Sequence, residues 1–205
     1  LALAEKGLDW QGRLLRLDGD QLDPAYLALN PAGRVPTLEH DGAVIAESNV
    51  ILEYLDDAFP DRPLRPDAPA DRAAARALIL RLDAGRDGLH HAVSVLTYAI
   101  AYRARLIAAA GSDAPDRLRP AIAAQMTPES RLWLEEAVLH GPAAPSAQDA
   151  LGRFDRLLAL FETRLRAWDW LTGPRLSATE IVYLPYLLRL RLLGLGALWR
   201  GRPAL

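Results

Sequence analysis

Residues 30–38 read Asn-Pro-Ala-Gly-Arg-Val-Pro-Thr-Leu, and residues 47–49 read Glu-Ser-Asn. Between these stretches, Asp41-Gly42 favours a type I′ turn that joins two short apolar runs, 35–40 and 43–46. Apolar residues then recur with the helical period, and the serine of the second stretch, Ser48, is expected to cap this helix. The sequence therefore predicts a turn, a strand that begins near a proline, a hairpin and a helix, in that order.

Two residue pairs in this region are suited to an extended, peptide-like ligand. If the Val35-Pro36 bond is cis, the N–H and C=O of Val35 face outward and can pair with a ligand as an added strand does. At Glu47-Ser48, the helix start and the serine hydroxyl offer donors to a carboxylate, and the glutamate can pair with an ammonium group. Each pair also has a purely structural explanation, since proline is tolerated at a strand start and serine is a common cap.

The remaining sequence divides into a short mixed part and a long helical part. Residues 1–7 resemble the tail of a helix with no start of its own, so the sequence is expected to begin in mid-element. Gln11–Asp18 is expected to be a strand, and Asp23-Pro24 starts a short helix. Strand patterns then end, which predicts a domain over residues 1–63, a linker over 64–70 and an all-helical domain over 71–205.

The helical part contains two patterns that predict helix starts. A long helix is expected from Asp71 towards Ala110, followed by a less regular stretch that is broken at Pro120 and Pro128. Ser146 with Asp149 is expected to cap the next helix, and Ser177 with Glu180 forms a capping box for the last one. The helix after Ser146 has an apolar stripe on one face, formed by Leu151, Phe154, Leu158, Phe161 and Leu165.

Composition excludes several classes of function. The 205 residues are 51% hydrophobic with a net charge of −2, which offers no basic surface for nucleic acid. The chain has no cysteine for a disulfide or a thiolate metal site. His90 and His91 point about 100° apart on a helix, so no metal site is expected there. No run reaches 18 consecutive apolar residues, so we expect a cytoplasmic protein with no membrane partner.

The motifs at residues 30–38 and 47–48, followed by Ile51-Leu52-Glu53-Tyr54-Leu55, resemble the N-terminal domain of cytosolic glutathione transferases. The capped helix at Ser177 is similar to the capping box of their C-terminal domain, with Glu180 in place of the usual aspartate. The resemblance implies a thioredoxin-like, glutathione-binding domain followed by an all-α domain. The first strand of the thioredoxin-like domain is expected before Leu1, and a final helix is expected after Leu205.

The resemblance also implies roles for individual residues. Val35, beside Pro36, binds the cysteinyl part of glutathione through its backbone, Glu47 and Ser48 hold the γ-glutamyl end, and Arg34 meets the glycyl carboxylate. Two tyrosines one turn apart, Tyr98 and Tyr102, line a second-substrate pocket or, as the alternative, pack in the core. The Ser, Tyr or Cys that activates the thiol is expected before Leu1, so the role of catalytic residue is left unassigned.

The function implied is that of a homodimeric glutathione S-transferase in detoxification, with glutathione as co-substrate and a hydrophobic, aromatic electrophile as its partner. The segments 88–101 and 185–195 are similar to a bacterial subgroup near the glutathione-dependent β-aryl etherases. Etherase activity and a maleylacetoacetate-type isomerase activity are therefore alternatives. A non-catalytic stress or assembly protein of the same fold is the alternative from another class.

Overall fold

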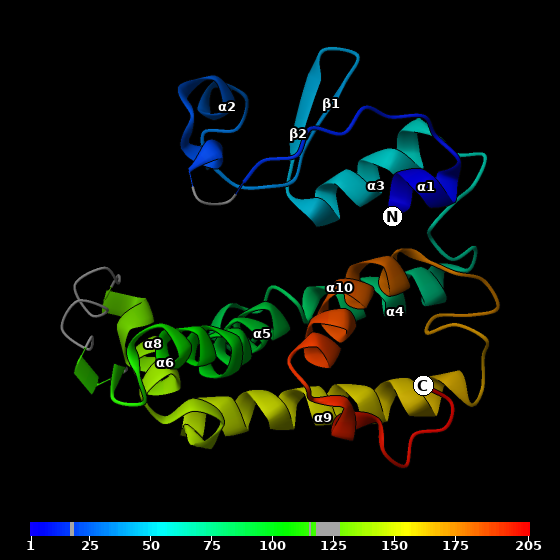
Figure 1. Ribbon diagram of the computed structural model, residues 1–205. Helices are drawn as coiled ribbons and strands as arrows, with labels where there is room; N and C mark the ends of the chain where they lie inside the picture. The colour runs from blue at the N-terminus through cyan, green and yellow to red at the C-terminus, as the bar shows by residue number, and fades with distance from the viewer. Residues whose placement is uncertain (17–18, 115, 118–127) are drawn as a thin grey trace.

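The computed structural model describes residues 1–16, 19–114, 116–117 and 128–205. A small α/β part lies above a larger helical part in Figure 1, and the N-terminus faces the helical part. The α/β part holds α1 (Ala2–Lys6), η1 (Asp20–Leu22), α2 (Pro24–Leu29), β1 (Thr37–His40), β2 (Ala43–Ala46) and α3 (Ser48–Ala58). The helical part holds α4 (Pro69–Leu80), η2 (Gly85–Asp87), α5 (Leu89–Thr97), η3 (Tyr98–Tyr102), α6 (Arg103–Ala110), α8 (Pro128–His140), η4 (Gly141–Ala143), α9 (Pro145–Leu165), α10 (Ala178–Leu192) and η5 (Gly196–Trp199).

The predicted hairpin is confirmed. Strands β1 and β2 pair antiparallel, with Thr37 opposite Ala46 and His40 opposite Ala43. Asp41 and Gly42 between them have φ values of 48° and 78°, the positive values that a type I′ turn requires. The local turn chemistry is therefore sufficient to set the register of this pair.

The strand expected at Gln11–Asp18 is not formed in the described residues 11–16, while residues 17–18 lie outside the description. A strand is stabilised by hydrogen bonds to a neighbouring strand, and the sheet that the structure describes contains only β1 and β2. Leu14 is 92% exposed and Leu15 is only partly buried, so neither of these described apolar side chains packs in a core. The prediction was wrong because an alternating pattern indicates that a segment could form a strand, but it does not show that a neighbouring strand is present to pair with it.

Helix α3 begins as expected, but its cap differs from the prediction. Ser48 is the first helical residue, Glu47 occupies the N-cap position, and no side chain there makes a capping hydrogen bond. Glu47 has φ 67° and ψ 118°, and such a positive φ is uncommon outside glycine. The expectation that Ser48 caps this helix was therefore wrong, and its hydroxyl is left for other uses.

The long helix expected from Asp71 is interrupted between α4 and α5, where Gly85 has φ 58°. Beyond the break, Leu89–Ala110 runs through α5, η3 and α6, and by length and composition alone it could span a membrane. Counting consecutive apolar residues did not find this stretch, because His, Ser, Thr and Arg interrupt it. One face of the stretch, with Val95, Leu96 and Ala99, is buried in the core, where α5 packs against α9.

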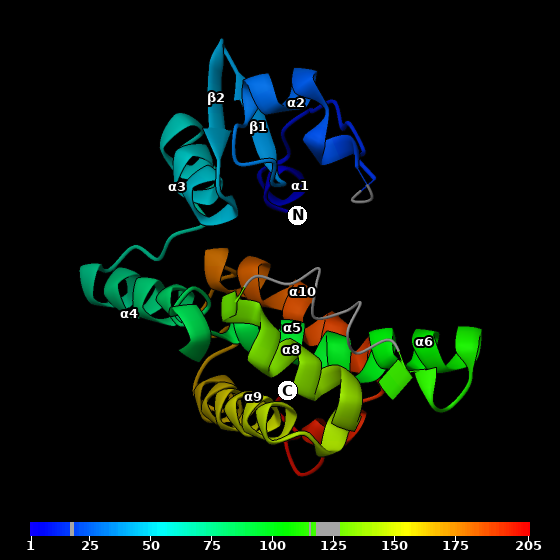
Figure 2. The same ribbon diagram turned by 90° about the vertical axis from the view of Figure 1, so that its left-hand side faces the viewer.

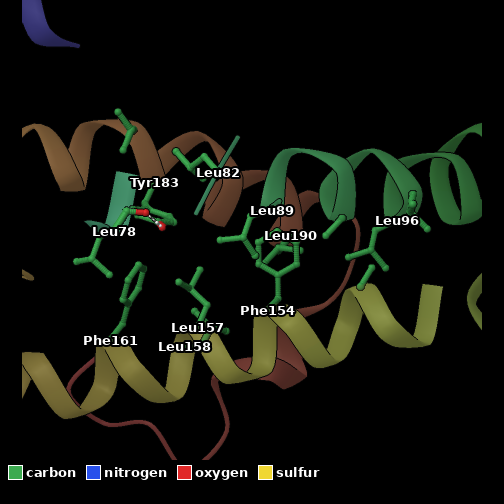
Figure 3. Close-up of a cluster of buried hydrophobic side chains, with 14 of the residues drawn as sticks. Leu78, Leu82, Leu89, Leu96, Phe154, Leu157, Leu158, Phe161, Tyr183 and Leu190 are labelled. Carbon is green, nitrogen blue, oxygen red and sulfur yellow. Dashed lines mark hydrogen bonds between the residues drawn. The ribbon is translucent and has the colours of Figure 1, made fainter. Parts of the chain in front are cut away.

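The core of the helical part lies between α9 and the helices above it (Figure 3). Phe154, Leu158 and Phe161 of the predicted apolar stripe are fully buried. They belong to one cluster with residues of α4, α5 and α10, among them Leu78, Leu89, Tyr183 and Leu190. Each large side chain buried in this way contributes about 1.5–3 kcal/mol to stability. In both Figure 1 and Figure 2, α10 lies on the side of this core that faces the α/β part.

The two predicted serine caps have different outcomes. Ser177 Oγ accepts a hydrogen bond from the Thr179 N–H at 3.1 Å, and Glu180 Oε2 accepts from the Ser177 N–H at 2.8 Å, which confirms the capping box. Helix α9 instead starts at Pro145, and the Ser146 hydroxyl is buried without a partner among the described residues. Proline at the first helical position moved the start one residue ahead of the predicted cap. Pro128 begins α8, and Pro120 lies outside the described residues.

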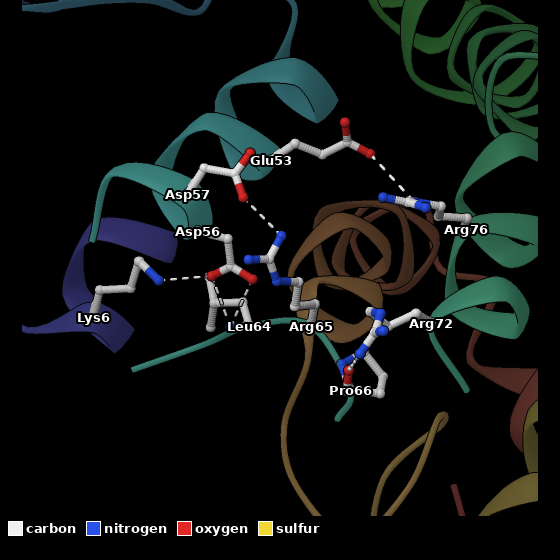
Figure 4. A network of polar contacts seen from close by, with 9 residues as sticks. All are labelled: Lys6, Glu53, Asp56, Asp57, Leu64, Arg65, Pro66, Arg72 and Arg76. Atoms are coloured by element: carbon white, nitrogen blue, oxygen red, sulfur yellow. Dashed lines mark hydrogen bonds and ion pairs between the residues drawn. The ribbon is translucent and has the colours of Figure 1, made fainter. Parts of the chain in front are cut away.

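A buried ion pair links α1, α3 and the segment that leads to the helical part (Figure 4). Lys6 Nζ lies 2.6 Å from Asp56 Oδ1, with side-chain exposures of 1% and 5%. The Asp56 carboxylate also accepts from the Leu64 N–H at 2.8 and 3.0 Å, and Lys6 donates to the Arg62 carbonyl at 2.8 Å. The Leu64 carbonyl accepts from the Ala178 N–H at 2.7 Å, which attaches this segment to α10. The α/β part is thus fixed against the helical part.

Candidate functional site

A cleft of about 1380 Å³ lies between the α/β part and the helical part. All five residues predicted to hold a peptide-like ligand line it, namely Arg34, Val35, Pro36, Glu47 and Ser48. These residues come from the turn before β1 and from the start of α3, two segments that the hairpin brings together. The structure thus gathers these five residues in one place.

The turn before β1 is held so that the Val35 backbone faces the cleft. The Val35-Pro36 bond is cis, and within the described ranges no protein group hydrogen-bonds to the N–H or C=O of Val35. The buried side chain of Asn30 braces the turn, since its Nδ2 donates to the Arg34 carbonyl at 2.8 Å and to Thr37 Oγ1 at 3.1 Å. Tyr26 of α2 also hydrogen-bonds to Thr37 Oγ1, at 2.8 Å. A fixed backbone with free polar groups is what an extended peptide needs for strand-like pairing.

The start of α3 forms the second half of this wall. Its first N–H groups have no partner within the helix and carry partial positive charge. In the part of the chain that the structure describes, no group hydrogen-bonds to the side chains of Glu47 or Ser48, and both are exposed. A carboxylate at the helix start and an ammonium group beside Glu47 would therefore find complementary charges within one turn. The guanidinium of Arg34 is likewise exposed and free of any carboxylate in the described ranges.

The helical part supplies the opposite wall, which the sequence reasoning did not assign. Val182, Pro185, Tyr186 and Arg189 of α10 line the cleft at the spacing of one helical face, and His90 of α5 joins them. His90 Nδ1 lies 3.2 Å from the Tyr186 hydroxyl. Burial, and then the charge of Asp83, raise the pKa of Tyr186, so its hydroxyl stays neutral at physiological pH. The i, i+3, i+4, i+7 spacing of these α10 residues shows in the sequence that they share one helix face. It does not show that this face meets the other domain.

Tyr98 and Tyr102 are not among the residues that line this cleft. Their rings pack edge to face with centroids 5.2 Å apart, and Tyr98 lies 6.1 Å from the ring of Trp133 on α8. Both tyrosines belong to η3, a single π-helical turn between α5 and α6. Tyr98 therefore packs between helices of the helical part, whereas Tyr102 is 38% exposed and contacts the Tyr98 ring.

Residues 1–58 match the family model of the glutathione S-transferase N-terminal domain, and residues 131–205 match that of the C-terminal domain. Maleylacetoacetate isomerase of Pseudomonas aeruginosa is 42% identical over 96 residues, covering 45% of this chain and 45% of that protein. A stringent starvation protein A homolog of Histophilus somni is 37% identical over 83 residues, covering 40% and 38%. The chain spans less than half the length of these curated relatives.

Among solved structures, the β-etherase LigF of Sphingobium sp. superposes with a TM-score of 0.64 at 27% identity, covering 88% of this chain and 72% of that one. This likeness covers both the α/β part and the helical part, and it agrees with the order of the two matched domain models. Since those two models together match well over half of its residues, the chain belongs to the glutathione S-transferase family.

Proposed function

We propose that this chain binds glutathione in the α/β wall of the cleft and presents its thiolate to a hydrophobic, aromatic electrophile held against α5 and α10. The observation that carries the proposal is the meeting of Val35, Glu47 and Ser48 in one cleft, each with polar groups that have no partner among the described residues. The Val35 backbone pairs with the cysteinyl residue, Glu47 and Ser48 hold the two charges of the γ-glutamyl end, and Arg34 meets the glycyl carboxylate.

The reaction proposed is nucleophilic attack by the thiolate sulfur on an electrophilic carbon. A C–S bond forms, and in a substitution the leaving group departs with the electron pair of the broken bond. A thiol with a pKa near 8.5 must be activated to react well at neutral pH. None of the described cleft residues is given that role.

Three further properties are proposed on the strength of family membership alone. The protein acts as a homodimer, works in the cytoplasm and serves detoxification. These properties rest on the resemblance and on the two matched domain models. Sedimentation analysis tests the first of them directly.

Three alternatives are each favoured by one relative. The likeness to LigF supports glutathione-dependent cleavage of a β-aryl ether. The identity with maleylacetoacetate isomerase supports an isomerisation in which glutathione is regenerated. The identity with a stringent starvation protein A homolog supports a non-catalytic role in stress or assembly.

Calorimetric titration with glutathione, followed by three activity assays, separates these functions. We expect binding, and thioether formation with an aryl halide. Cleavage of a guaiacylglycerol ether alone selects the etherase, and isomerisation of a maleylacetoacetate-type substrate alone selects the isomerase. Binding without any turnover supports the non-catalytic alternative and removes the transferase. Failure to bind glutathione removes the whole proposal.

A further inference from the structure

The helical wall of the cleft contains a positive charge that none of the described residues neutralises. Arg189 lies one turn beyond Tyr186 on α10, and both line the cleft. Within the described ranges, no carboxylate lies close enough to the Arg189 guanidinium to form an ion pair. By contrast, Arg153 and Arg202 in the same helical part lie 2.5 and 2.7 Å from the carboxylates of Asp149 and Asp155. Arg189 is thus available to a ligand in the cleft.

Two of the described residues that line the cleft carry a carboxylate, Asp83 and Glu47. Asp83, in the segment between α4 and η2, accepts a hydrogen bond at Oδ2 from Asn49 Nδ2 at 2.9 Å. Glu47 lies on the opposite wall, at the start of α3, where the proposed function gives it the ammonium group of glutathione. Within the described part of the chain, neither carboxylate forms an ion pair with Arg189, so neither neutralises this guanidinium.

The helical wall around Arg189 is apolar and aromatic. Val93, Ile181 and Pro185 line it together with the ring of Tyr186. His90 Nδ1 lies 3.2 Å from the Tyr186 hydroxyl, with the two rings edge to face at 6.3 Å, which fixes the orientation of the phenol. Such a wall fits a flat apolar ring, and a guanidinium at its edge presents a planar fork that matches a carboxylate.

We propose that Arg189 selects electrophiles whose aromatic ring carries a carboxylate remote from the carbon that the thiolate attacks. The inference rests on the proposed function, because it assigns the class of second substrate to the same cleft. Arg189 acts as a specificity residue: it holds the substrate anion and takes no part in bond making. Substrates without the carboxylate bind the same wall more weakly.

The test measures binding, so that it does not depend on turnover. Two glutathione conjugates differ in one group only: S-(4-carboxy-2-nitrophenyl)glutathione and its 4-carbamoyl analogue. Their dissociation constants are compared by calorimetry in the wild type, in Arg189→Gln and in Arg191→Gln. Arg191 is an exposed arginine on the same helix that does not line the cleft, which makes it the matched control.

We expect the wild type and Arg191→Gln to bind the carboxylate conjugate about tenfold more tightly than the carbamoyl conjugate. Arg189→Gln should lose this preference and keep its affinity for glutathione itself. Added salt should reduce the preference in the wild type, since the contact lies between charges at a solvated cleft. Circular dichroism melting confirms that both variants are folded.

The outcomes separate the two proposals. If the wild type binds glutathione but shows no preference, or if Arg189→Gln keeps the preference, the assignment of Arg189 is wrong and glutathione binding stands. Equal loss of preference in Arg191→Gln also overturns the assignment, because the preference would then depend on the overall positive charge of the helix and not on Arg189. If the wild type does not bind glutathione, the proposed function fails and the inference fails with it.

Discussion

Asn49 Nδ2 donates a hydrogen bond to Asp83 Oδ2 at 2.9 Å, and this contact joins the first turn of α3 to the segment between α4 and η2. It lies next to Glu47 and Ser48, and all four residues line the cleft. The proposed glutathione wall and the helical wall are therefore tied together where the charged end of the ligand would enter. The contact is solvent-exposed, so it contributes more to the geometry of the cleft than to overall stability.

Replacing Asn49 tests this contact. Asn49→Ala should lower the free energy of unfolding by only about 0.5 kcal/mol, because the lost hydrogen bond is exposed to water. Asn49→Asp should cost more, because two carboxylates would then face each other. Urea unfolding of both variants measures the difference. Equal stabilities of the Asp and Ala variants would show that Asp83 does not approach this position in solution.

The buried pair of Lys6 and Asp56 is expected to matter far more. Lys6→Met removes the cation and leaves a buried carboxylate without its charge partner, which typically costs about 3–5 kcal/mol. Arg65→Met is the control, since it breaks an ion pair with Asp57 of similar length, 2.7 Å, whose partners are 50% and 69% exposed. That change should cost at most about 1 kcal/mol. If urea unfolding showed that Lys6→Met and Arg65→Met lower the free energy of unfolding by similar amounts, the expectation that the buried ion pair matters more would be wrong.

Two serines that look alike in sequence should respond differently to alanine. Ser177→Ala removes the acceptor of the Thr179 N–H and should cost about 1–2 kcal/mol. Ser146→Ala removes a buried hydroxyl that has no partner in the described residues, so stability should stay within about 0.5 kcal/mol or rise. Thermal melting of the two variants checks the contrast. A marked loss in Ser146→Ala would restore Ser146 as the cap of α9.

These serines illustrate which parts of the fold could be predicted from sequence. The Asp41-Gly42 hairpin and the Ser177–Glu180 box are formed by residues close in sequence, so their patterns carried the full geometry. Residues 11–16 depended on a partner strand, which no local pattern reports. At Ser146, the helix begins one residue earlier, at Pro145, so the serine does not occupy the cap position.

The same distinction applies to the candidate site. Its α/β wall was predicted because Val35 and Glu47-Ser48 lie on either side of one hairpin, and the resemblance assigned their roles. The helical wall was missed, because the spacing of Tyr186 and Arg189 identifies a helix face but not the domain that this face meets. Tyr98 and Tyr102 have a similar spacing, but they do not line this cleft; Tyr98 packs against Trp133 and Tyr102 packs against Tyr98.

The pH dependence of stability should reveal Tyr183. Its hydroxyl donates to the Leu78 carbonyl at 2.6 Å, and burial raises its pKa well above the ordinary value near 10. Above pH 10 the unfolded chain loses this proton while the folded chain keeps it, so stability falls as pH rises. The slope from this group approaches about 1.4 kcal/mol per pH unit. In Tyr183→Phe the decline should be shallower, as urea unfolding between pH 9 and 11 would show, whereas an unchanged slope would assign the titration to another group.

Ser48 offers the sharpest separation between a structural role and a binding role. A capping serine that is changed to alanine costs about 1 kcal/mol of stability, but Ser48 makes no capping hydrogen bond, so Ser48→Ala should melt like the wild type. The variant's binding free energy for glutathione should weaken by about 1–3 kcal/mol, because the hydroxyl would no longer donate to the γ-glutamyl carboxylate. Calorimetric titration measures the affinity, and Ser112→Ala, outside the cleft, is the control that should change neither quantity. Lower stability with unchanged affinity would return Ser48 to a capping role and remove it from the site.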